Sequence, residues 1–439
     1  MSLPGILLTL ATVGLLLALP KWWAPLPFFI NAALIPFSQE MEVGPVHLTG
    51  IRFLVAAGLL RMMTKGDRLT GGLIPLDKWM ILWAFWFAVT SVFHDSSALM
   101  TRLGEIFNDV GIYFLFRIYI QNVNDILRLF KMTCVVVVPL AVVMLCEKFT
   151  GTDYFGVLFG GFTESLVRNG HVRAQGPFEH PIMAGTVGAV CLPMALYLWR
   201  QQRKLALIGM AAAGSIVVAS ASSGPVMTAF SIFGGMAMWK IRNHLRVIRW
   251  LFVGMLVALN FIMNDPVYFL VARIDISGGS TGWYRAQLIR RAIEQIGQWW
   301  FAGTDYTRNW MLVEINKSNT DITNYYIRMG VWGGLLLMFI FIAILYAAFA
   351  AIGRTLRSSE AAPFEFRFLY WVLGSILFGH AVTFFSVSYF DQTVVFFYML
   401  LAVIGSISAV TLSTAPSAVM AADQPAIQRP ATESSGGHG

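Results

Sequence analysis

The chain has 439 residues, of which 57% are hydrophobic and 12% are charged, and its net charge is +8. Apolar runs of bilayer length recur from residue 5 to about residue 411. A membrane β-barrel would instead show alternating segments of about ten residues, which continuous runs such as CVVVVPLAVVML exclude. The composition therefore predicts an all-α polytopic membrane protein.

The apolar runs predict about 12–13 transmembrane helices. The first run lacks a basic start and a small-residue cleavage site, so we expect it to be retained as a helix. The second run is short and rich in Pro, so it can cross, re-enter or lie at the interface. In chain order the predicted segments are 5–19, 26–37, 46–62, 79–94, 99–119, 127–147, 181–199, 205–220, 225–240, 249–263, 326–352, 368–387 and 393–411.

The positive charge gathers in five short loops between these segments, which the positive-inside rule places in the cytoplasm. This distribution argues against a nucleic-acid partner. Two polar regions then face outward, at residues 149–180 and 264–325, and the second is a large loop expected to contain helices. Residues 1–412 form the predicted transmembrane domain, and residues 413–439 are predicted to be a disordered cytoplasmic tail.

The large outer loop contains GWYRAQLIRRAIEQIGQWW, whose spacing predicts one helix. Arg285 projects into an apolar stripe of this helix, whereas Arg290 and Arg291 lie opposite and can pair with Glu294. The residues of the stripe are Leu288, Ile289, Ala292, Ile293 and Ile296. An Arg on a packing face is costly unless an anion meets it, which favours a ligand-binding role. The structural alternative is a side chain that extends to lipid headgroups.

The stretch RNGHVRAQGPFEHPIMAGT, at 168–186, predicts irregular backbone followed by a helix that begins at Pro181. The start of that helix, with Arg173 and His180 nearby, is suited to phosphate or diphosphate. The structural alternative is that Arg168 and Arg173 bind headgroups or balance nearby Glu residues. That alternative is favoured for Arg168 and stays open for Arg173.

No metal or other cofactor is expected. His171 and His180 lack a suitably spaced carboxylate or thiolate, and the outer loops contain no DxD pair.

Four motifs, taken in order, resemble the bacterial O-antigen ligase and polymerase family, which includes exopolysaccharide polymerases. They are RAQGPFEHPIMAG, SSGP at 222–225, YR at 284–285 followed by WFAGTD, and DITNYYIRMGVWGG. The resemblance covers roughly residues 20–410. It implies a GT-C-like fold and a metal-independent, inverting glycosyltransferase on the periplasmic face of the bacterial inner membrane. Its substrates would be undecaprenyl-diphosphate-linked saccharides, with the diphosphate held by Arg173 and Arg285.

One family feature is missing, since a His-Asn pair common late in the large loop reads Thr323 and Asn324 here. SSGP likewise has Ser223 where relatives often have Arg. In the family this His is commonly the candidate acid–base or acceptor-orienting group. Because it is absent here, another residue has to take that role.

The proton acceptor therefore stays open among Glu179, His180 and Asp321, and we favour Asp321. The alternative for Asp321 is an N-cap for a helix starting near Thr323. Thr323, Asn324 and Tyr325 are candidates for orienting the acceptor, although interfacial anchoring is the common role of such a Tyr.

We expect a polymerase that joins lipid-linked repeat units into exopolysaccharide, capsule or O-antigen. An O-antigen ligase that transfers glycan to lipid A core is the alternative enzyme, and transfer to protein is a third acceptor class. A flippase for lipid-linked oligosaccharide is the alternative from another class, although transporters favour internal repeats and polar residues at mid-membrane. The expected partners are the lipid-linked donor and acceptor, membrane lipids, and chain-length regulator and export proteins.

Overall fold

The computed structural model is mostly helical, with 75% of the chain in helices. It describes residues 1–44, 46–273, 282–308, 310–311 and 320–422. The helices in the first half are α1 Leu3–Ala18, α2 Pro25–Leu34, α3 Gly50–Lys65, α4 Pro75–Ser91, α5 Ser96–Tyr119, α6 Val123–Thr150, α7 Tyr154–Phe159, α8 Pro181–Tyr197 and α9 Arg203–Ala219. Those in the second half are α10 Ser223–Ala237, α11 Leu245–Ile262, α12 Leu270–Arg273, α13 Gly282–Glu294, α14 Ile296–Trp299, α15 Tyr325–Ser358, α16 Phe364–Thr383 and α17 Thr393–Ala422.

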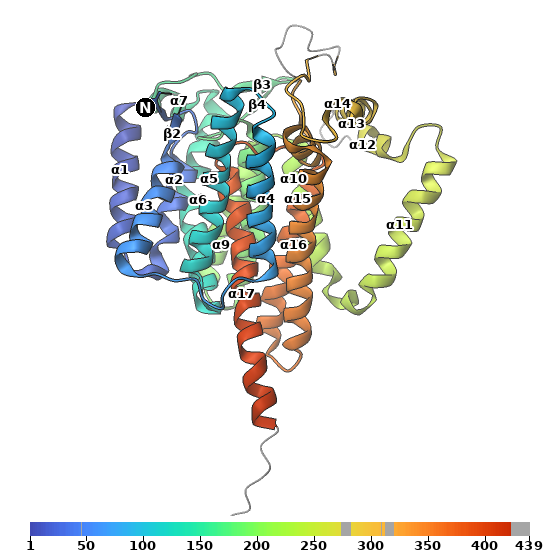
Figure 1. Cartoon of the computed structure of the whole chain (residues 1–439). Coiled ribbons are helices and arrows are strands. Elements are labelled where there is room, and N and C mark those ends of the chain that lie inside the picture. Colours follow the sequence, from blue (N-terminus) through green and yellow to red (C-terminus); the bar gives the residue numbers. More distant parts are fainter. Residues whose placement is uncertain (45, 274–281, 309, 312–319, 423–439) are drawn as a thin grey trace, which may run out of the picture.

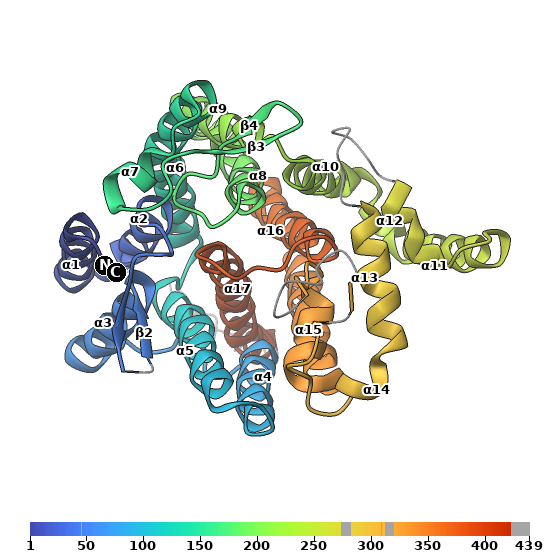
Figure 2. The same ribbon diagram turned by 90° about the horizontal axis from the view of Figure 1, so that it is seen from above.

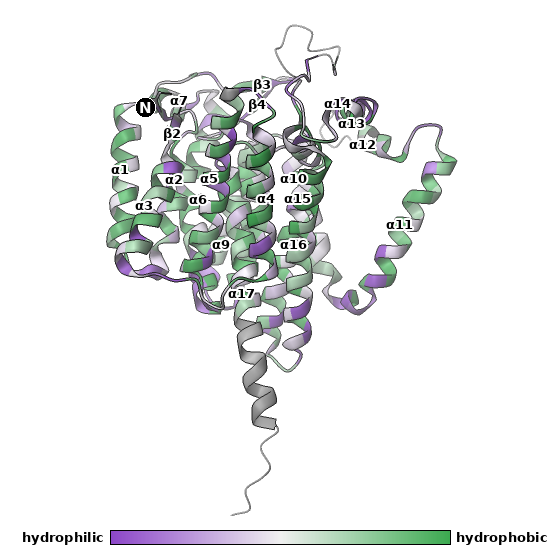
Figure 3. Ribbon diagram, viewed as in Figure 1, coloured by the Kyte–Doolittle hydropathy of each residue, from purple (hydrophilic) through white to green (hydrophobic). Residues whose placement is uncertain are grey.

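Five helical segments of the described chain are long and apolar enough to cross a membrane, as expected for an all-α membrane protein. They are Val123–Thr150, Pro181–Arg200, Ser223–Ile262, Tyr325–Ser358 and Phe364–Thr383. Shorter apolar helices lie at Leu3–Ala18 and Thr393–Ala409. Figure 3 shows apolar residues along most of the bundle's length, with polar residues gathered mainly towards its two ends.

Helix α17 occupies the middle of the bundle, where Figure 2 shows α4, α5, α8, α15 and α16 around it. Every residue from Asp391 to Ala409 is buried. A helix that is apolar on all sides is typical of a protein core or of a membrane span, and in this bundle neighbouring helices cover it. Helix α17 packs against α5 and α15.

The predicted segments are helical, with some differences at their boundaries. The segment 46–62 begins as strand β2 (Val46–Thr49), which pairs with β1 (Glu40–Val43), and its helix starts only at Gly50. Helix α16 ends at Thr383, before the predicted boundary at 387. The single helix expected from GWYRAQLIRRAIEQIGQWW is interrupted at Gln295, between α13 and α14.

The predicted tail is corrected in part, because helix α17 continues through residues 413–422. The remainder of the predicted tail, residues 423–439, lies outside the described residues.

The two segments predicted to face outward lie at the same end of the bundle in Figure 1. The first holds α7 and the hairpin of β3 (Leu166–Arg168) and β4 (His171–Arg173), so residues 168–173, which were expected to be irregular, belong to a short hairpin instead. The second holds α12, α13 and α14, so the expectation that the large loop contains helices is confirmed.

Candidate functional site

Arg173 is the last residue of β4, and hydrogen bonds hold both its side chain and the backbone that follows it. Its Nη2 donates to the Ser222 hydroxyl oxygen at 2.7 Å, and the next residue, Ala174, donates its N–H to the Ala219 carbonyl at 3.1 Å. The side chain is only 8% exposed, and its buried Nε has no hydrogen-bond partner among the described residues. The Arg173 guanidinium is therefore fixed in place while keeping donor capacity.

Glu147, near the end of α6, anchors the turn that follows Arg173. Its two carboxylate oxygens accept the backbone N–H groups of Gln175 at 3.0 Å and Gly176 at 2.9 Å. Gly176 has φ +59°, and a Cβ there would lie 3.1 Å from Met144 Cγ, so glycine suits this position. The turn at Gln175 and Gly176 is thus bound to α6.

His180 is the N-cap of α8, and Pro181 opens the helix as predicted. Its Nδ1 accepts the N–H of Ile182 at 3.1 Å, which places the proton of a neutral imidazole on Nε2. Burial, followed by the charges of Arg173, Arg168 and Arg285, lowers the pKa of His180 to about 4. At neutral pH this side chain is therefore a hydrogen-bond donor at Nε2, which makes it a poor general base.

Arg285 reaches the same place from α13 in the large loop. Its Nε donates to the Ser386 carbonyl at 3.1 Å, and the side chain is 9% exposed. Burial and the neighbouring Arg168 charge lower the pKa of Arg285. The predicted burial of Arg285 is confirmed.

The predicted pairing on the opposite face of α13 is confirmed too, since Arg290 and Arg291 contact Glu294 at 3.2 and 2.8 Å. The proposed apolar stripe is only partly correct. Leu288 and Ala292 are buried, but Ile293 and Ile296 are 54% and 41% exposed.

Arg168, Arg173 and Arg285, together with His180, form what we call the arginine cluster. Their charges influence one another although they come from β3, β4 and α13. Among the described residues, neither Arg173 nor Arg285 forms an ion pair with a carboxylate. Two buried guanidinium groups that lack a paired carboxylate are stabilised by an anionic ligand.

Glu179 lies beside the cluster but carries an exposed side chain. The surrounding protein and the Glu40 carboxylate nonetheless raise its pKa. Its backbone N–H donates to Asp391 Oδ2 at 3.3 Å. Asp391 is fully buried, and burial raises its pKa to about 6.

The loop at 384–392, between α16 and α17, is a part of the site that the sequence reasoning missed. In addition to the Ser386 and Asp391 contacts, the Ser388 hydroxyl donates to the Ile322 carbonyl at 2.5 Å, and Arg328 Nη1 donates to the Tyr389 carbonyl at 3.2 Å. The available signal was the polar run SVSYFDQT between two apolar helices on the predicted outer side.

Asp321 does not cap α15, so that alternative is corrected. The N-cap is Asn324, whose side-chain oxygen accepts the Ile327 N–H at 3.1 Å and whose amide donates to the Phe385 carbonyl at 3.3 Å. Asp321 has an exposed side chain, and its carbonyl accepts the Tyr284 hydroxyl at 2.9 Å. Since Tyr284 precedes Arg285 in α13, Asp321 lies against the helix that carries that arginine.

Of two other predicted residues, Tyr325 is buried and Thr323 is partly exposed. Tyr325 is 2% exposed and packs against Phe341 and Phe384, with ring centroids 5.1 and 4.9 Å away. Thr323 has a buried hydroxyl without a partner among the described residues. Asn324 caps α15 and Tyr325 packs in the interior, so both residues stabilise the start of this helix.

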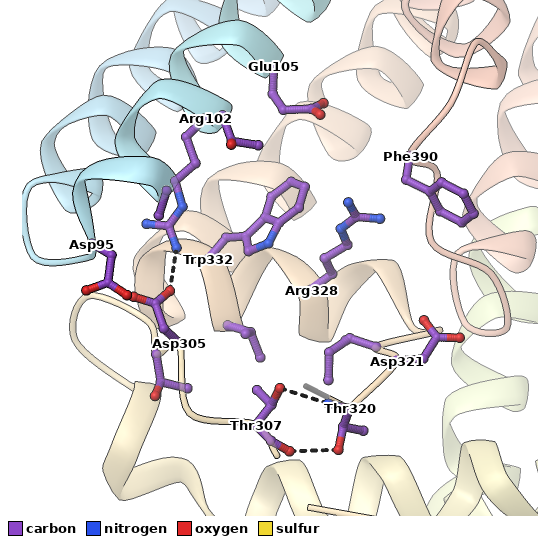
Figure 4. A pocket seen from close by; sticks show the side chains of 15 residues that line it. Asp95, Arg102, Glu105, Asp305, Thr307, Thr320, Asp321, Arg328, Trp332 and Phe390 are labelled. Carbon is purple, nitrogen blue, oxygen red and sulfur yellow. Dashed lines mark hydrogen bonds and ion pairs between the residues drawn. The ribbon is translucent and has the colours of Figure 1, made fainter. Parts of the chain in front are cut away.

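A pocket of about 710 Å³ opens between the start of α5, the start of α15 and the loop before α15. Of the residues proposed from the sequence, it includes only Asp321 (Figure 4). Its charged lining residues are Asp95, Arg102, Glu105, Asp305, Asp321 and Arg328. We call this cavity the outer pocket, because part of its lining comes from the segment 264–325, which is predicted to face outward.

The two arginines of the outer pocket are held by an aromatic stack. Phe87 and Trp332 stack at 5.4 Å with an interplanar angle of 11°. The Arg102 guanidinium lies 5.8 Å from the Phe87 ring centre, and that of Arg328 lies 4.1 Å from the Trp332 ring centre. The stack therefore fixes two positive groups at separate points of the pocket.

The motif VWGG builds part of the pocket wall. Helix α15 is kinked at Gly333 and Gly334, and Gly334 has φ +79°. A Cβ on Gly334 would lie 2.0 Å from the Phe301 carbonyl oxygen, so only glycine allows this approach. The contact brings the segment that follows Phe301, including the pocket residue Asp305, against α15.

Glu40, Glu42 and His47, on the β1–β2 hairpin, place potential ligand atoms within 4.8 Å of one another. Glu42 and His47 are exposed, and such surface groups commonly exist without a metal. None of the three lines the outer pocket. The sequence matches no protein-family model, and a comparison with curated proteins finds no significant match.

Proposed function

We propose that this protein is an inverting glycosyltransferase of the bacterial inner membrane with a GT-C-like architecture. It would polymerise undecaprenyl-diphosphate-linked repeat units on the periplasmic face. The observation that carries the proposal is the arginine cluster, in which Arg173 and Arg285 are buried beside His180 without a carboxylate partner among the described residues. A diphosphate is an anion of suitable charge for such a cluster.

The convergence of separate motifs supports the proposal. Arg173 contacts Ser222 of SSGP, and Tyr284 of the YR motif contacts Asp321 of the DITN segment. Segments separated by 49 and 37 positions therefore meet at one end of the bundle. Contact between motifs that lie far apart in the sequence is expected where they build one site.

In the proposed reaction, a hydroxyl oxygen of the acceptor saccharide attacks the anomeric carbon of the donor. A new glycosidic C–O bond forms on the face opposite the leaving group, so the configuration is inverted. The bond between the anomeric carbon and the diphosphate oxygen breaks, and its electron pair goes to the diphosphate. Arg173 and Arg285 stabilise the negative charge that develops there, and His180 donates a hydrogen bond from Nε2.

Asp321 is the proposed acceptor of the hydroxyl proton, which it later releases to water. It is exposed, lines the outer pocket and lies against α13. His180 is less suited to this role because its unprotonated nitrogen caps α8. Glu179 has an exposed carboxylate beside the cluster and remains the alternative base.

Replacement of each buried arginine tests the proposal. We expect Arg173→Ala and Arg285→Ala, expressed in a strain that lacks the chromosomal gene, to reduce surface polymer by about a hundredfold or more, the range for removal of one charge-stabilising donor. Arg290→Ala is the matched control on α13, because Arg290 is exposed and pairs with Glu294. Normal polymer from both Arg173→Ala and Arg285→Ala, with protein levels verified, would refute the proposal.

Analysis of the accumulated glycan separates the alternatives. A polymerase defect leaves single repeat units on lipid A core, a ligase defect leaves lipid-linked chains that are not transferred, and a flippase defect leaves repeat units on the cytoplasmic face. For Asp321→Asn, a polymer yield equal to that of the wild type at all pH values would remove Asp321 as the base.

A further inference from the structure

We infer that the outer pocket binds an uncharged portion of the acceptor saccharide, with the reacting end of that saccharide at Asp321. This inference rests on the proposed function and assigns it a second binding site. The arginine cluster would hold the donor diphosphate, and the outer pocket would hold the acceptor.

The first argument is the difference in charge between the two sites. The outer pocket is lined by two arginines and four carboxylates, whereas Arg173 and Arg285 have no paired carboxylate in the described part of the chain. Because the lining has more carboxylates than arginines, it favours a neutral ligand over a diphosphate or an acidic sugar. They are good acceptors for sugar hydroxyl groups, and the arginines supply the matching donors.

The second argument is that one arginine keeps unused donor capacity. Arg102 is 5% exposed, and its Nη1 has no hydrogen-bond partner among the described residues, while its Nη2 lies 3.5 Å from Asp305 Oδ1. A buried donor without a partner is costly, and a ligand hydroxyl in the pocket would satisfy it. Asp305 is fixed in turn by His94 Nδ1 at 2.8 Å, so the donor and acceptor groups at this end are held in place.

The third argument is the shape of the pocket and its aromatic surface. A volume of about 710 Å³ lies within the range of about 300–1,000 Å³ usual for small-molecule sites. Trp332 is covered by Phe87 and Arg328, so it supports the arginine and is not free to stack on a sugar. Phe390 is 36% exposed, with the Arg328 guanidinium 5.8 Å from its ring centre, and its exposed surface offers the pocket an apolar contact for the C–H face of a sugar.

The position of Asp321 at one side of the pocket suggests how the acceptor saccharide would be oriented in it. Figure 4 shows Asp321 and Phe390 on one side of the pocket and Asp95, Arg102 and Asp305 on the other. The backbone carbonyl of Asp321 accepts the Tyr284 hydroxyl of α13, the helix that carries Arg285. The acceptor hydroxyl would lie at the Asp321 end, and the sugars behind it would extend towards Arg102.

Saturation-transfer NMR on the full-length protein in nanodiscs tests this inference directly. The probe is the neutral repeat-unit oligosaccharide released by partial acid hydrolysis of the producing strain's surface polysaccharide. We expect Phe390→Leu and Arg102→Gln each to weaken binding about tenfold, on the order expected for loss of one aromatic or charged contact. Phe261→Leu is the matched control, because Phe261 is 83% exposed on α11 and lies outside the pocket.

Farnesyl diphosphate serves as the probe of the arginine cluster in the same samples. We expect Phe390→Leu to leave its binding unchanged, and Arg173→Ala with Arg285→Ala to weaken it while oligosaccharide binding persists. Equal oligosaccharide binding by wild type, Phe390→Leu and Arg102→Gln, or no binding by wild type, would overturn the inference and leave the proposed function standing. Loss of farnesyl diphosphate binding in Arg102→Gln would also overturn it, because the outer pocket would then be the anion site.

Discussion

The strongest structural test concerns Glu147, a residue that does not reach the arginine cluster itself. Glu147 is completely buried, and its carboxylate accepts the N–H groups of Gln175 and Gly176, which follow Arg173 by two and three positions. Glu147→Ala removes both acceptors and leaves two donors without partners. A hydrogen bond to a charged group contributes about 1.5–3 kcal/mol, so the two together contribute roughly 3–6 kcal/mol.

Removing a buried charge also relieves its desolvation, which offsets part of this loss. We therefore expect the native conformation of the turn to be weakened by roughly 3 kcal/mol, or about a hundredfold in its equilibrium with open conformations. Because the turn holds Arg173, polymer formation should fall although Glu147 does not contact substrate. Glu147→Gln keeps one acceptor oxygen and should show a smaller loss.

The assay compares polymer yield, protein level and melting temperature of the purified protein in detergent. Glu164→Ala is the matched control, because Glu164 is an exposed carboxylate of the same outer segment. Wild-type activity and melting temperature for Glu147→Ala would show that the two hydrogen bonds do not position Arg173.

Three further predictions concern the same region. Ser222→Ala removes the 2.7 Å hydrogen bond to Arg173 and should lower polymer yield about tenfold, whereas Ser222→Thr should retain most of it; equal yields for the two variants would contradict the positioning role. Gly176→Ala places a side chain at φ +59° and 3.1 Å from Met144 Cγ, so thermal melts should show a loss of about 1–2 kcal/mol, and an unchanged melting temperature would refute the required glycine. The pKa of His180 is lowered to about 4, so the native state binds fewer protons than the unfolded chain, and stability should fall as pH drops from about 6.5 to about 4. His180→Asn, which keeps a capping side chain, should flatten that part of the profile of melting temperature against pH, and an unaltered slope would assign the titration to another group.

Several elements of the fold could be predicted from the sequence, because their causes are local. Bilayer-length apolar runs predicted the helices, and Pro181 predicted the start of α8. The spacing of Arg285 against Arg290 predicted which of the two is buried, since helical periodicity alone determines the face on which each residue lies. The pairing of strands into two hairpins was not predicted, because these short strands lack a long alternating pattern.

The candidate site was predictable only in part. Arg173 and Arg285 were selected separately, and nothing local indicated that both would influence the pKa of His180. An N-cap was weighed for Asp321 as the alternative to catalysis, whereas the cap is Asn324. Both residue types favour that position, and an error of a few residues in a predicted helix start changes which of them caps the helix.

By itself the sequence determined that this chain is built from apolar helices and that its distinctive polar residues lie in two segments between them. Only the tertiary structure showed that these segments meet and that the loop at 384–392 contacts both. It also showed that Arg102 lies against Phe87 and Arg328 against Trp332, in a stack of the two rings. The reason is physical, since periodicity and turn chemistry act over a few residues. The pocket, in contrast, depends on how α4, α5 and α15 pack, which their separate sequences do not specify.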